Sequence, residues 1–275
     1  MSDWTQSRME VPRVGPLGWL LVALRGTALA LVTYGCLLLF LLVRLLERPL
    51  FGLARPWTPY ITQGVCRSAL FIMGFGYSVR GRPMAERGAI VANHVGWMDI
   101  FTLNAADRVY FVSKDDVADW PGIGILARVT GTMFIARKST EAKVQQQMME
   151  DRLRAGHRLL FFPEGTSTDS IRVLPFKTPL FQAFFTHGLD RVMYIQPVTV
   201  VYHAPLGRDP RYYGWWSDMS FAAHLLMVLA TPRQGRVEVL FHPPVPVDGF
   251  ENRKQLAAYC ETVIRTAHPL AGPRG

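Results

Sequence analysis

The sequence lacks several features that would assign it to a familiar class of protein. It has only three cysteines, Cys36, Cys66 and Cys260, and their spacing matches neither a disulfide framework nor a metal site. No Gly-x-Ser-x-Gly segment occurs, so the nucleophile elbow of serine hydrolases is missing. The 30 lysine and arginine residues are dispersed, without a nucleic-acid-binding motif. These absences favour reduced structural thiols and disfavour a serine hydrolase or a nucleic-acid-binding protein.

Charge is missing from one long segment near the N-terminus. Residues 26–43 contain no charged side chain, and apolar character extends on both sides from Leu17 to Leu46. The run is about as long as the hydrocarbon core of a bilayer requires. A cleaved signal peptide fits less well, because the run is long, starts late and lacks a clear cleavage site. We expect membrane attachment, either by a spanning helix or by a helical hairpin with residues 57–75 in one leaflet.

The distribution of positive charge predicts which side of the membrane the rest of the chain occupies. Six arginines follow the apolar run: Arg44, Arg48, Arg55, Arg67, Arg80 and Arg82. Arg8 and Arg13 precede it, alongside Asp3 and Glu10. The positive-inside rule therefore predicts a cytoplasmic C-terminal part on a bacterial inner membrane. A net charge of +9 fits a protein whose partners include anionic membrane lipids, although a solvated basic surface would also account for it.

Beyond residue 80 the pattern changes to short apolar runs that alternate with helical segments. Strands are expected at residues 88–92, 109–113, 132–135, 158–162, 193–201 and 236–241. Helices are expected between them, at residues 139–155, 180–187, 221–229 and 252–267. The alternation predicts an α/β fold with a largely parallel central sheet flanked by helices. We divide the chain into a membrane-associated helical region, 1–80, and a second domain, 81–275.

The segment Asn93-His94-Val95-Gly96-Trp97-Met98-Asp99 follows the first expected strand directly. Ligand-binding turns of α/β folds lie at such positions. A neutral His94 can accept a proton from a hydroxyl group, while Asp99 binds the other ring nitrogen and stabilises the imidazolium. Trp97 and Met98 are expected to anchor the turn in an apolar wall. A histidine that merely caps the next helix, beside an aspartate in its first turn, is the plainer interpretation.

A second block, Phe162-Pro163-Glu164-Gly165-Thr166, follows another expected core strand. A glutamate at the end of a strand can accept hydrogen bonds from a ligand hydroxyl. Gly165 lets the backbone approach a ligand closely. An ordinary polar turn would have a similar composition. We expect His94 and Arg137 to line one cleft that opens toward the bilayer.

Basic residues follow other expected strands. Arg137 ends the run 131–137, and its planar guanidinium suits a phosphate group. Lys114 and Lys177 would add positive potential, although each alone is as well explained as a surface charge. Pro197 interrupts the strand 193–201, which predicts an edge or a bend rather than an interior strand.

These residues resemble the motifs of the lysophospholipid acyltransferase family, typified by the bacterial 1-acylglycerol-3-phosphate acyltransferase. Four blocks stand in the family's order, at residues 93–99, 131–137, 162–166 and 195–198. The resemblance covers residues 75–245 and implies acyl transfer from acyl-CoA or acyl carrier protein to a lysolipid hydroxyl, with no metal or other cofactor. It implies that His94 is the base and Asp99 its partner. The acceptor would be held by Asn93, Lys114, Arg137, Glu164, Gly165, Thr166 and Lys177.

Two positions depart from the family's pattern. Gly96 stands where serine is usual, and Ser167 stands where many members carry an arginine. Losing that arginine weakens the case for a phosphate-bearing acceptor, and residues 166–177 look similar to the branch that acylates lyso-ornithine lipid. Arg172 is a candidate replacement for the missing charge. The acceptor of the family's typical member, 1-acylglycerol-3-phosphate, remains the first expectation and would give phosphatidic acid. Lyso-ornithine lipid is the alternative.

Two rival functions remain on the sequence alone. A hydrolase would release the acyl group without an acceptor, and a basic membrane lipid-binding protein would catalyse nothing. Acyl-chain length, acyl donor and oligomeric state leave no readable pattern in the sequence.

Overall fold

The computed structural model describes residues 4–6, 9, 13–120, 122–135, 142–185 and 192–271. Its helices are α1 (Pro16–Phe51), α2 (Thr58–Met73), α3 (Asp99–Ala106), α4 (Ile123–Thr130), α5 (Ala142–Arg154), α6 (Phe221–Ala230) and α7 (Arg253–Ala267). Short 3₁₀ helices are η1 (Trp4–Gln6), η2 (Asp115–Asp119), η4 (Pro179–Phe185) and η6 (Val247–Gly249). The strands are β1 (Gly76–Arg80), β2 (Gly88–Ala92), β3 (Tyr110–Lys114), β4 (Met133–Ile135), β5 (Leu159–Phe161), β6 (Tyr194–His203), β7 (Arg236–Phe241) and β8 (Val245–Pro246).

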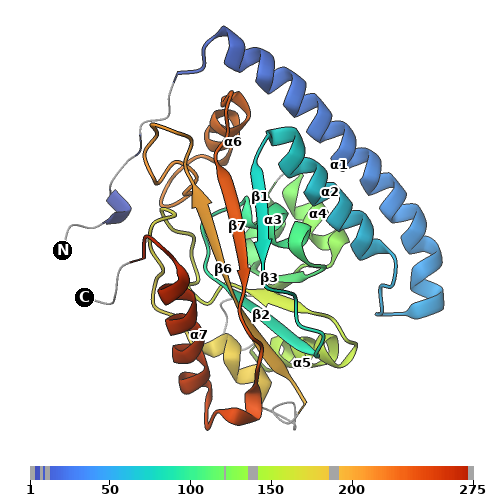
Figure 1. The fold of residues 1–275 in the computed structure, drawn as a ribbon. Coiled ribbons are helices and arrows are strands. Elements are labelled where there is room, and N and C mark those ends of the chain that lie inside the picture. The colour runs from blue at the N-terminus through green and yellow to red at the C-terminus, as the bar shows by residue number, and fades with distance from the viewer. Residues whose placement is uncertain are drawn as a thin grey trace.

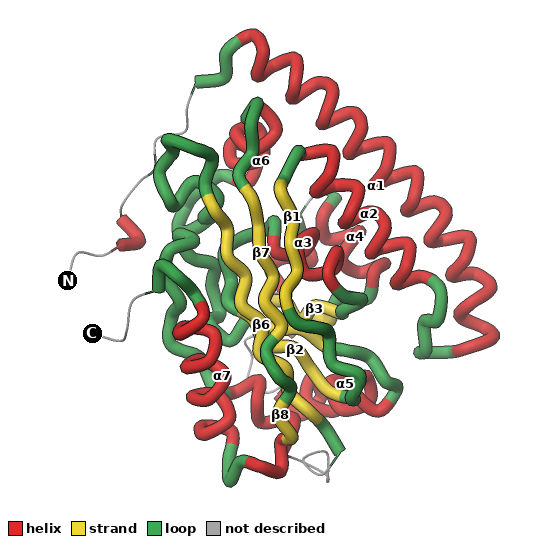
Figure 2. Tube along the Cα trace, viewed as in Figure 1, coloured by secondary structure: helices red, strands yellow, loops and turns green. Residues whose placement is uncertain are grey.

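The strands form one twisted sheet in the order β1-β7-β6-β2-β5-β3-β4, with β8 paired to β6 (Figures 1 and 2). From β6 to β4 all neighbours are parallel, whereas β7 and β8 pair with β6 in the antiparallel sense. The carboxyl ends of β2, β5 and β3 therefore lie at one edge of the sheet. The predicted α/β class and the largely parallel sheet are confirmed.

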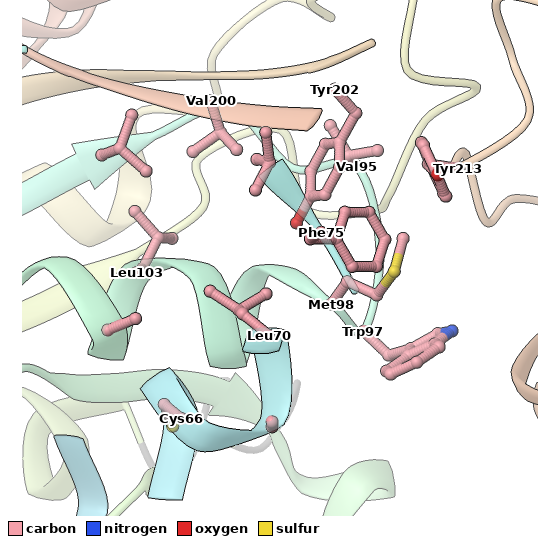
Figure 3. Packing of buried hydrophobic residues seen from close by; sticks show 14 of the residues in the cluster. Cys66, Leu70, Phe75, Val95, Trp97, Met98, Leu103, Val200, Tyr202 and Tyr213 are labelled. Atoms are coloured by element: carbon pink, nitrogen blue, oxygen red, sulfur yellow. The ribbon is translucent and has the colours of Figure 1, made fainter. Parts of the chain in front are cut away.

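The central strands are apolar throughout because helices cover both faces of the sheet. Ile90 and Leu160 point into a core with α2, α3 and α6, whereas Val91, Leu159 and Phe161 point into another with α5, η4 and α7. Figure 3 shows the first core, in which Leu70 of α2 and Leu103 of α3 lie together. Every residue of β2 is buried.

Helices α1 and α2 run side by side along one flank of the domain (Figure 1). Helix α2 belongs to the first core through Cys66, Ala69, Leu70 and Met73. Helix α1 is the one described helix that is long and apolar enough to cross a membrane, and only 6% of its most apolar window is buried. Its outward face carries leucines at seven-residue spacing, all at least 59% exposed: Leu17, Leu24, Leu31, Leu38 and Leu45.

The interior position of Pro197 contradicts the expectation of an edge or bend. Pro197 is buried in β6, between β2 and β7, and pairs with Val91. Its carbonyl accepts from the backbone N–H of His242, just beyond the end of β7. The N and O atoms of one strand residue face the same side. The proline nitrogen therefore faces the gap between β7 and β8, where no ladder hydrogen bond is lost.

Several elements were not predicted from the sequence. Strand β1 is largely exposed, so it lacks the continuous apolar run that marked the buried strands. Helices α3 and α4 have eight residues each, too short to show a clear helical period. The segment expected as a helix at 180–187 begins as the 3₁₀ helix η4, and residues 186 and 187 lie outside the described residues. The domain boundary at residue 80 stays a prediction, although β1 precedes it and belongs to the sheet.

Candidate active site

His94 and Asp99 meet at the carboxyl end of β2. His94 lies two residues beyond the strand, and Asp99 opens α3. His94 Nδ1 lies 2.8 Å from Asp99 Oδ2, so the hydrogen bond that the spacing predicts is present. Because an ionised carboxylate only accepts hydrogen bonds, this contact places the imidazole proton on Nδ1 and a lone pair on Nε2. The His94 side chain is 23% exposed, and its ring stacks on Phe162 at 4.0 Å between centroids.

Asp99 is held by backbone and side-chain donors although it is fully buried. Its Oδ2 atom also accepts from the N–H groups of Val95 at 2.7 Å and Gly96 at 3.1 Å. These bonds close the turn between β2 and α3 around the carboxylate. Val95, Trp97 and Met98 meanwhile point into the first core (Figure 3). The predicted apolar anchoring of the turn by Trp97 and Met98 is confirmed.

Tyr202 completes the set of groups on Asp99 and was missed in the sequence. Its phenol donates to Asp99 Oδ1 at 3.0 Å, and Thr102 Oγ1 lies 2.9 Å from the phenol oxygen. Burial, followed by the neighbouring Asp99, raises the pKa of Tyr202, so the phenol stays protonated and remains a donor. No motif marks this tyrosine, because 103 residues separate it from Asp99.

Glu164 contacts the backbone of the His94 turn. Its Oε1 atom accepts from the N–H of His94 at 2.7 Å, and its Oε2 atom accepts from the N–H of Leu174 at 2.7 Å. The backbone N–H of Thr168 donates to the His94 carbonyl at 3.0 Å. Glu164 and His94 thus lie side by side. The segment after β5 therefore holds the backbone of His94 at both its N–H and its carbonyl.

Burial sets the ionisation of Glu164. The residue is 1% exposed, and burial raises its pKa to about 8, against the opposing effect of the two backbone hydrogen bonds. Both oxygens are occupied by backbone donors, so the carboxyl group is not presented to an incoming ligand. The geometry favours a role in holding the turn over the expected direct contact with a ligand hydroxyl.

Asn93 has a similar internal position. It is fully buried, its Nδ2 atom donates to the carbonyl of Val200 at 2.9 Å, and its Oδ1 atom accepts from the Val200 N–H at 2.8 Å. The side chain thus ties the turn after β2 to β6. This arrangement also favours a positioning role over the contact with an acceptor implied by the resemblance.

Other predicted binding residues surround the same edge of the sheet. Thr166 is exposed on the turn after β5, and Lys114 is exposed at the end of β3. Gly165 adopts φ +71°, and a Cβ atom there would lie 2.8 Å from Lys177 Nζ, so glycine admits the lysine at this turn. Arg137 lies outside the described residues, and its expected position in a shared cleft with His94 stays a prediction.

The two departures from the family pattern have structural counterparts. A Cβ atom at Gly96 would lie 2.9 Å from the Cβ of Trp215. The backbone N–H of Trp215 donates to the Val95 carbonyl at 3.0 Å. Glycine therefore lets the Trp215 segment close on the His94 turn. Arg172, the candidate replacement for the missing arginine, forms an ion pair with the buried Asp169 at 2.7 Å. Its charge is already neutralised.

The arrangement can perform general base catalysis. A histidine with a fixed tautomer and a carboxylate behind it can accept a proton at Nε2 from a hydroxyl and return it to a leaving group. Within the described parts of the chain, no three His, Cys, Asp or Glu residues gather as a metal site would require. The expectation that no metal or cofactor is needed stays a prediction.

Comparisons with known proteins indicate the family and the fold of the chain. A family model described as Acyltransferase matches residues 78–201. A lyso-ornithine lipid O-acyltransferase of Rhodobacter capsulatus is 65% identical over 245 residues, 89% of each chain. A 1-acyl-sn-glycerol-3-phosphate acyltransferase of Neisseria gonorrhoeae is 35% identical over 126 residues, 44% of this chain and 49% of that protein. The crystal structure of the 1-acyl-sn-glycerophosphate acyltransferase PlsC from Thermotoga maritima has a similar fold, with TM-score 0.64, 20% identity, and coverage of 90% of this chain and 93% of that one.

Proposed function

The chain belongs to the lysophospholipid acyltransferase family, and we propose that it acylates the free hydroxyl group of lyso-ornithine lipid. The observation that carries this choice is the 65% identity to the Rhodobacter capsulatus lyso-ornithine lipid acyltransferase over 89% of both chains. The sequence placed 1-acylglycerol-3-phosphate first as acceptor and lyso-ornithine lipid second. The relatives favour the second acceptor, because the Rhodobacter capsulatus enzyme is 65% identical over 89% of this chain, whereas the Neisseria gonorrhoeae 1-acylglycerol-3-phosphate enzyme is 35% identical over 44% of it.

The charges around the site support an acceptor without phosphate. Ser167 stands where many members of the family have an arginine, and Arg172 is paired with Asp169. An ornithine head group instead offers a carboxylate and an ammonium group. Lys177, beside Gly165, is a suitable partner for that carboxylate. Lys114 and Thr166 at the same edge complete the proposed binding surface for the head group.

The proposed reaction uses His94 as a general base. As the acceptor oxygen attacks the acyl thioester, Nε2 of His94 takes the hydroxyl proton. The tetrahedral intermediate collapses with cleavage of the carbon–sulfur bond, and the imidazolium returns the proton to the departing thiolate. Asp99 holds the Nδ1 proton throughout, and Tyr202 and two backbone N–H groups keep Asp99 in place. Acyl-CoA and acyl carrier protein both remain candidate donors.

The packing of α1 favours attachment along the membrane surface over a span. Arg25, in the first half of α1, donates to the carbonyls of Leu229 and Thr231 at the end of α6, at 2.9 and 2.7 Å. Glu47, near the other end, accepts from the N–H groups of Trp57 and Thr58, at 2.7 and 3.0 Å. Both halves are thereby fastened to the domain. The outward leucine face is left for the hydrocarbon, with the domain on the cytoplasmic side.

Labelling from each side of the membrane tests this orientation. In a Cys36→Ala background, cysteines introduced at Arg13 and at Arg233 should react with an impermeant maleimide from the same, cytoplasmic side. Labelling of the cysteine at position 13 from the opposite side would establish a span.

An acceptor assay tests the proposed activity. Purified protein in neutral detergent is supplied with acyl carrier protein or CoA thioesters and with either lyso-ornithine lipid or 1-acylglycerol-3-phosphate, and products are identified by mass spectrometry. We expect diacylated ornithine lipid from the wild type and none from His94→Ala. Thioester loss without an acylated acceptor would indicate a hydrolase, and no thioester loss with any donor would indicate a binding protein.

A further inference from the structure

A pocket lies at the edge of the sheet opposite to the one that carries His94. It has a volume of about 440 Å³ and is lined by the amino-terminal ends of β2, β3 and β5, at Gly88, Tyr110 and Arg158. The turn between α1 and α2 closes one side. The six-residue path from Gly88 to His94 corresponds to about 20 Å of extended chain. The pocket is therefore separate from the candidate active site.

Positive charge dominates the wall of this pocket. The ionisable residues include four arginines and one glutamate: Arg55, Arg87, Arg108, Arg158 and Glu86. Arg158 is neutralised by an ion pair with Asp107. Among the described residues, neither Arg87 nor Arg108 has an ion pair.

The partners of Arg55 and Arg108 are uncharged. Arg55 donates to the Val129 carbonyl at 3.0 Å, and the guanidinium carbon of Arg108 lies 4.1 Å from the ring centre of Tyr60. These contacts fix the side chains without neutralising them. An anion entering the pocket would therefore find arginines already in place, at little further cost in side-chain entropy.

The arginines are close enough to affect neighbouring titrations. Burial, and then the charge of Arg55, lower the pKa of Arg152 to about 10. Burial, and then Arg152, lower the pKa of His157 to about 4. His157 is thus neutral at physiological pH, although it lines the pocket. Positive charge in this region is in excess, and a bound anion would relieve the repulsion.

The rim of the pocket is apolar and aromatic. Phe51 and Tyr60 line the pocket and are exposed, and further exposed apolar side chains lie beside them in the sequence around the turn between α1 and α2: Leu50, Leu53 and Trp57. Phe51 and Trp57 pack edge to face at 5.1 Å between ring centres. Tryptophan and tyrosine favour the interface between lipid and water. Exposed leucines continue from the end of α1 into this turn, at Leu45, Leu50 and Leu53, so an apolar surface suited to a membrane borders the pocket.

We propose that this pocket binds the phosphate-bearing head group of an anionic phospholipid. Arg87 and Arg108 contact the phosphate, and the aromatic rim lies among the upper acyl chains. This arrangement follows the general preference of basic pockets beside membrane helices for anionic head groups. The inference concerns membrane docking at the amino edge of the sheet, and it holds whichever lysolipid is the acceptor.

Binding of soluble short-chain lipids to the full-length protein in neutral maltoside micelles tests the proposal. Dihexanoyl phosphatidylglycerol is titrated and followed by ³¹P NMR, with dihexanoyl phosphatidylcholine, inorganic phosphate and CoA as comparison ligands. We expect phosphatidylglycerol to bind at least tenfold more tightly than each of the others. Equal or tighter binding of inorganic phosphate or CoA would overturn the assignment to a lipid head group.

Matched charge variants locate the binding. Arg87→Gln with Arg108→Gln should weaken phosphatidylglycerol binding at least tenfold, whereas Arg233→Gln with Arg236→Gln, the same charge change on an exposed segment elsewhere, should change it less than twofold. Acyl transfer in neutral micelles should be unchanged in both. Ala85→Glu, which keeps every arginine and adds a carboxylate to the wall, provides a second variant should the double substitution not fold. Equal losses in the pocket and control variants, or full binding by Ala85→Glu, would refute the site.

Discussion

The two edges of the sheet hold buried ionisable groups in opposite ways. At the carboxyl edge, Asp99 and Glu164 are fully enclosed, and backbone N–H groups supply most of their hydrogen bonds. At the amino edge, Arg55 and Arg152 donate to the carbonyls of Val129 and Gly131, and both guanidinium groups lie near the ring of Tyr110. One edge uses its charges to hold a histidine in place. The other leaves a positive field directed at the solvent.

This contrast separates two tasks that a lipid-modifying enzyme must perform. Chemistry needs a rigid group with a fixed tautomer, and carboxylates enclosed by backbone donors give that rigidity. Attachment to an anionic surface needs charge that the protein itself does not neutralise. Substitutions at the carboxyl edge should therefore change turnover or stability. Substitutions of the exposed arginines at the amino edge should change lipid binding.

The largest expected effect is that of Asp99→Asn. The amide keeps the volume of the aspartate side chain. Its NH2 group, however, faces the N–H and O–H groups that donate to Asp99, so the tautomer and the orientation of His94 are lost. We expect the rate constant of acyl transfer, measured in single-turnover assays with saturating acceptor, to fall about 10³-fold. The midpoint of thermal unfolding serves as the control. A loss under tenfold in a folded variant would contradict the role of Asp99 behind His94.

Glu164→Gln should alter the pH dependence of stability at the carboxyl edge. Burial raises the pKa of Glu164 in the folded protein to about 8, above its ordinary value of 4.5. As pH rises, the unfolded chain therefore releases this proton before the folded chain does. The stabilisation that protonated Glu164 gives to the folded state is present at acid pH and is lost as pH rises from about 4.5 to 8. The variant should remove a decline on the order of 2–4 kcal/mol in unfolding free energy over that window. Denaturant titrations at several pH values measure it, and parallel curves for both proteins would contradict the assignment.

His157→Asn should have the opposite signature at the amino edge. Burial and neighbouring arginines lower the pKa of His157 from 6.5 to about 4, and one ring nitrogen lies 2.8 Å from the Leu53 carbonyl. The unfolded chain binds the proton first as pH falls, so stability is lost between about 6.5 and 4. The variant should flatten this acid limb by about 1–3 kcal/mol while leaving the limb above pH 7 intact. An unchanged acid limb would place the titration elsewhere.

Tyr202→Phe should have the smallest effect. It removes one donor from Asp99 but leaves the His94 contact and both backbone donors in place. The loss of one hydrogen bond to a charged group corresponds to roughly tenfold in kcat. The KM for the acceptor should stay constant, because Tyr202 is buried behind Asp99. A raised KM at constant kcat would instead indicate contact with the substrate.

The sequence predicts the sheet and the local turn better than it predicts the long-range contacts. The bounds of β2 and β7 match the expected strands, because β2 is a continuous apolar run and the apolar residues of β7 stand out between charged ones. The His94–Asp99 contact follows from spacing within one turn. Tyr202 reaches Asp99 from another strand, and Pro197 is tolerated only because β7 has ended beside it. Such contacts depend on how strands align in space, which no local pattern records.

The burial of Glu164 shows a second limit. A glutamate beside a glycine reads as a ligand-binding turn, and only the packing of η4 and α7 against β5 encloses it. The roles of Asn93, Lys114, Thr166 and Lys177 remain predictions, as does that of Arg137, which lies outside the described residues.

A competition between the two acceptors tests the central claim most directly. Equal concentrations of lyso-ornithine lipid and 1-acylglycerol-3-phosphate are mixed with one acyl donor and the wild-type protein, and the initial ratio of products gives the ratio of kcat/KM. The account predicts that acylated ornithine lipid predominates by at least about 100-fold, a difference of about 2.7 kcal/mol in transition-state binding. Equal products, or an excess of phosphatidic acid, would contradict it.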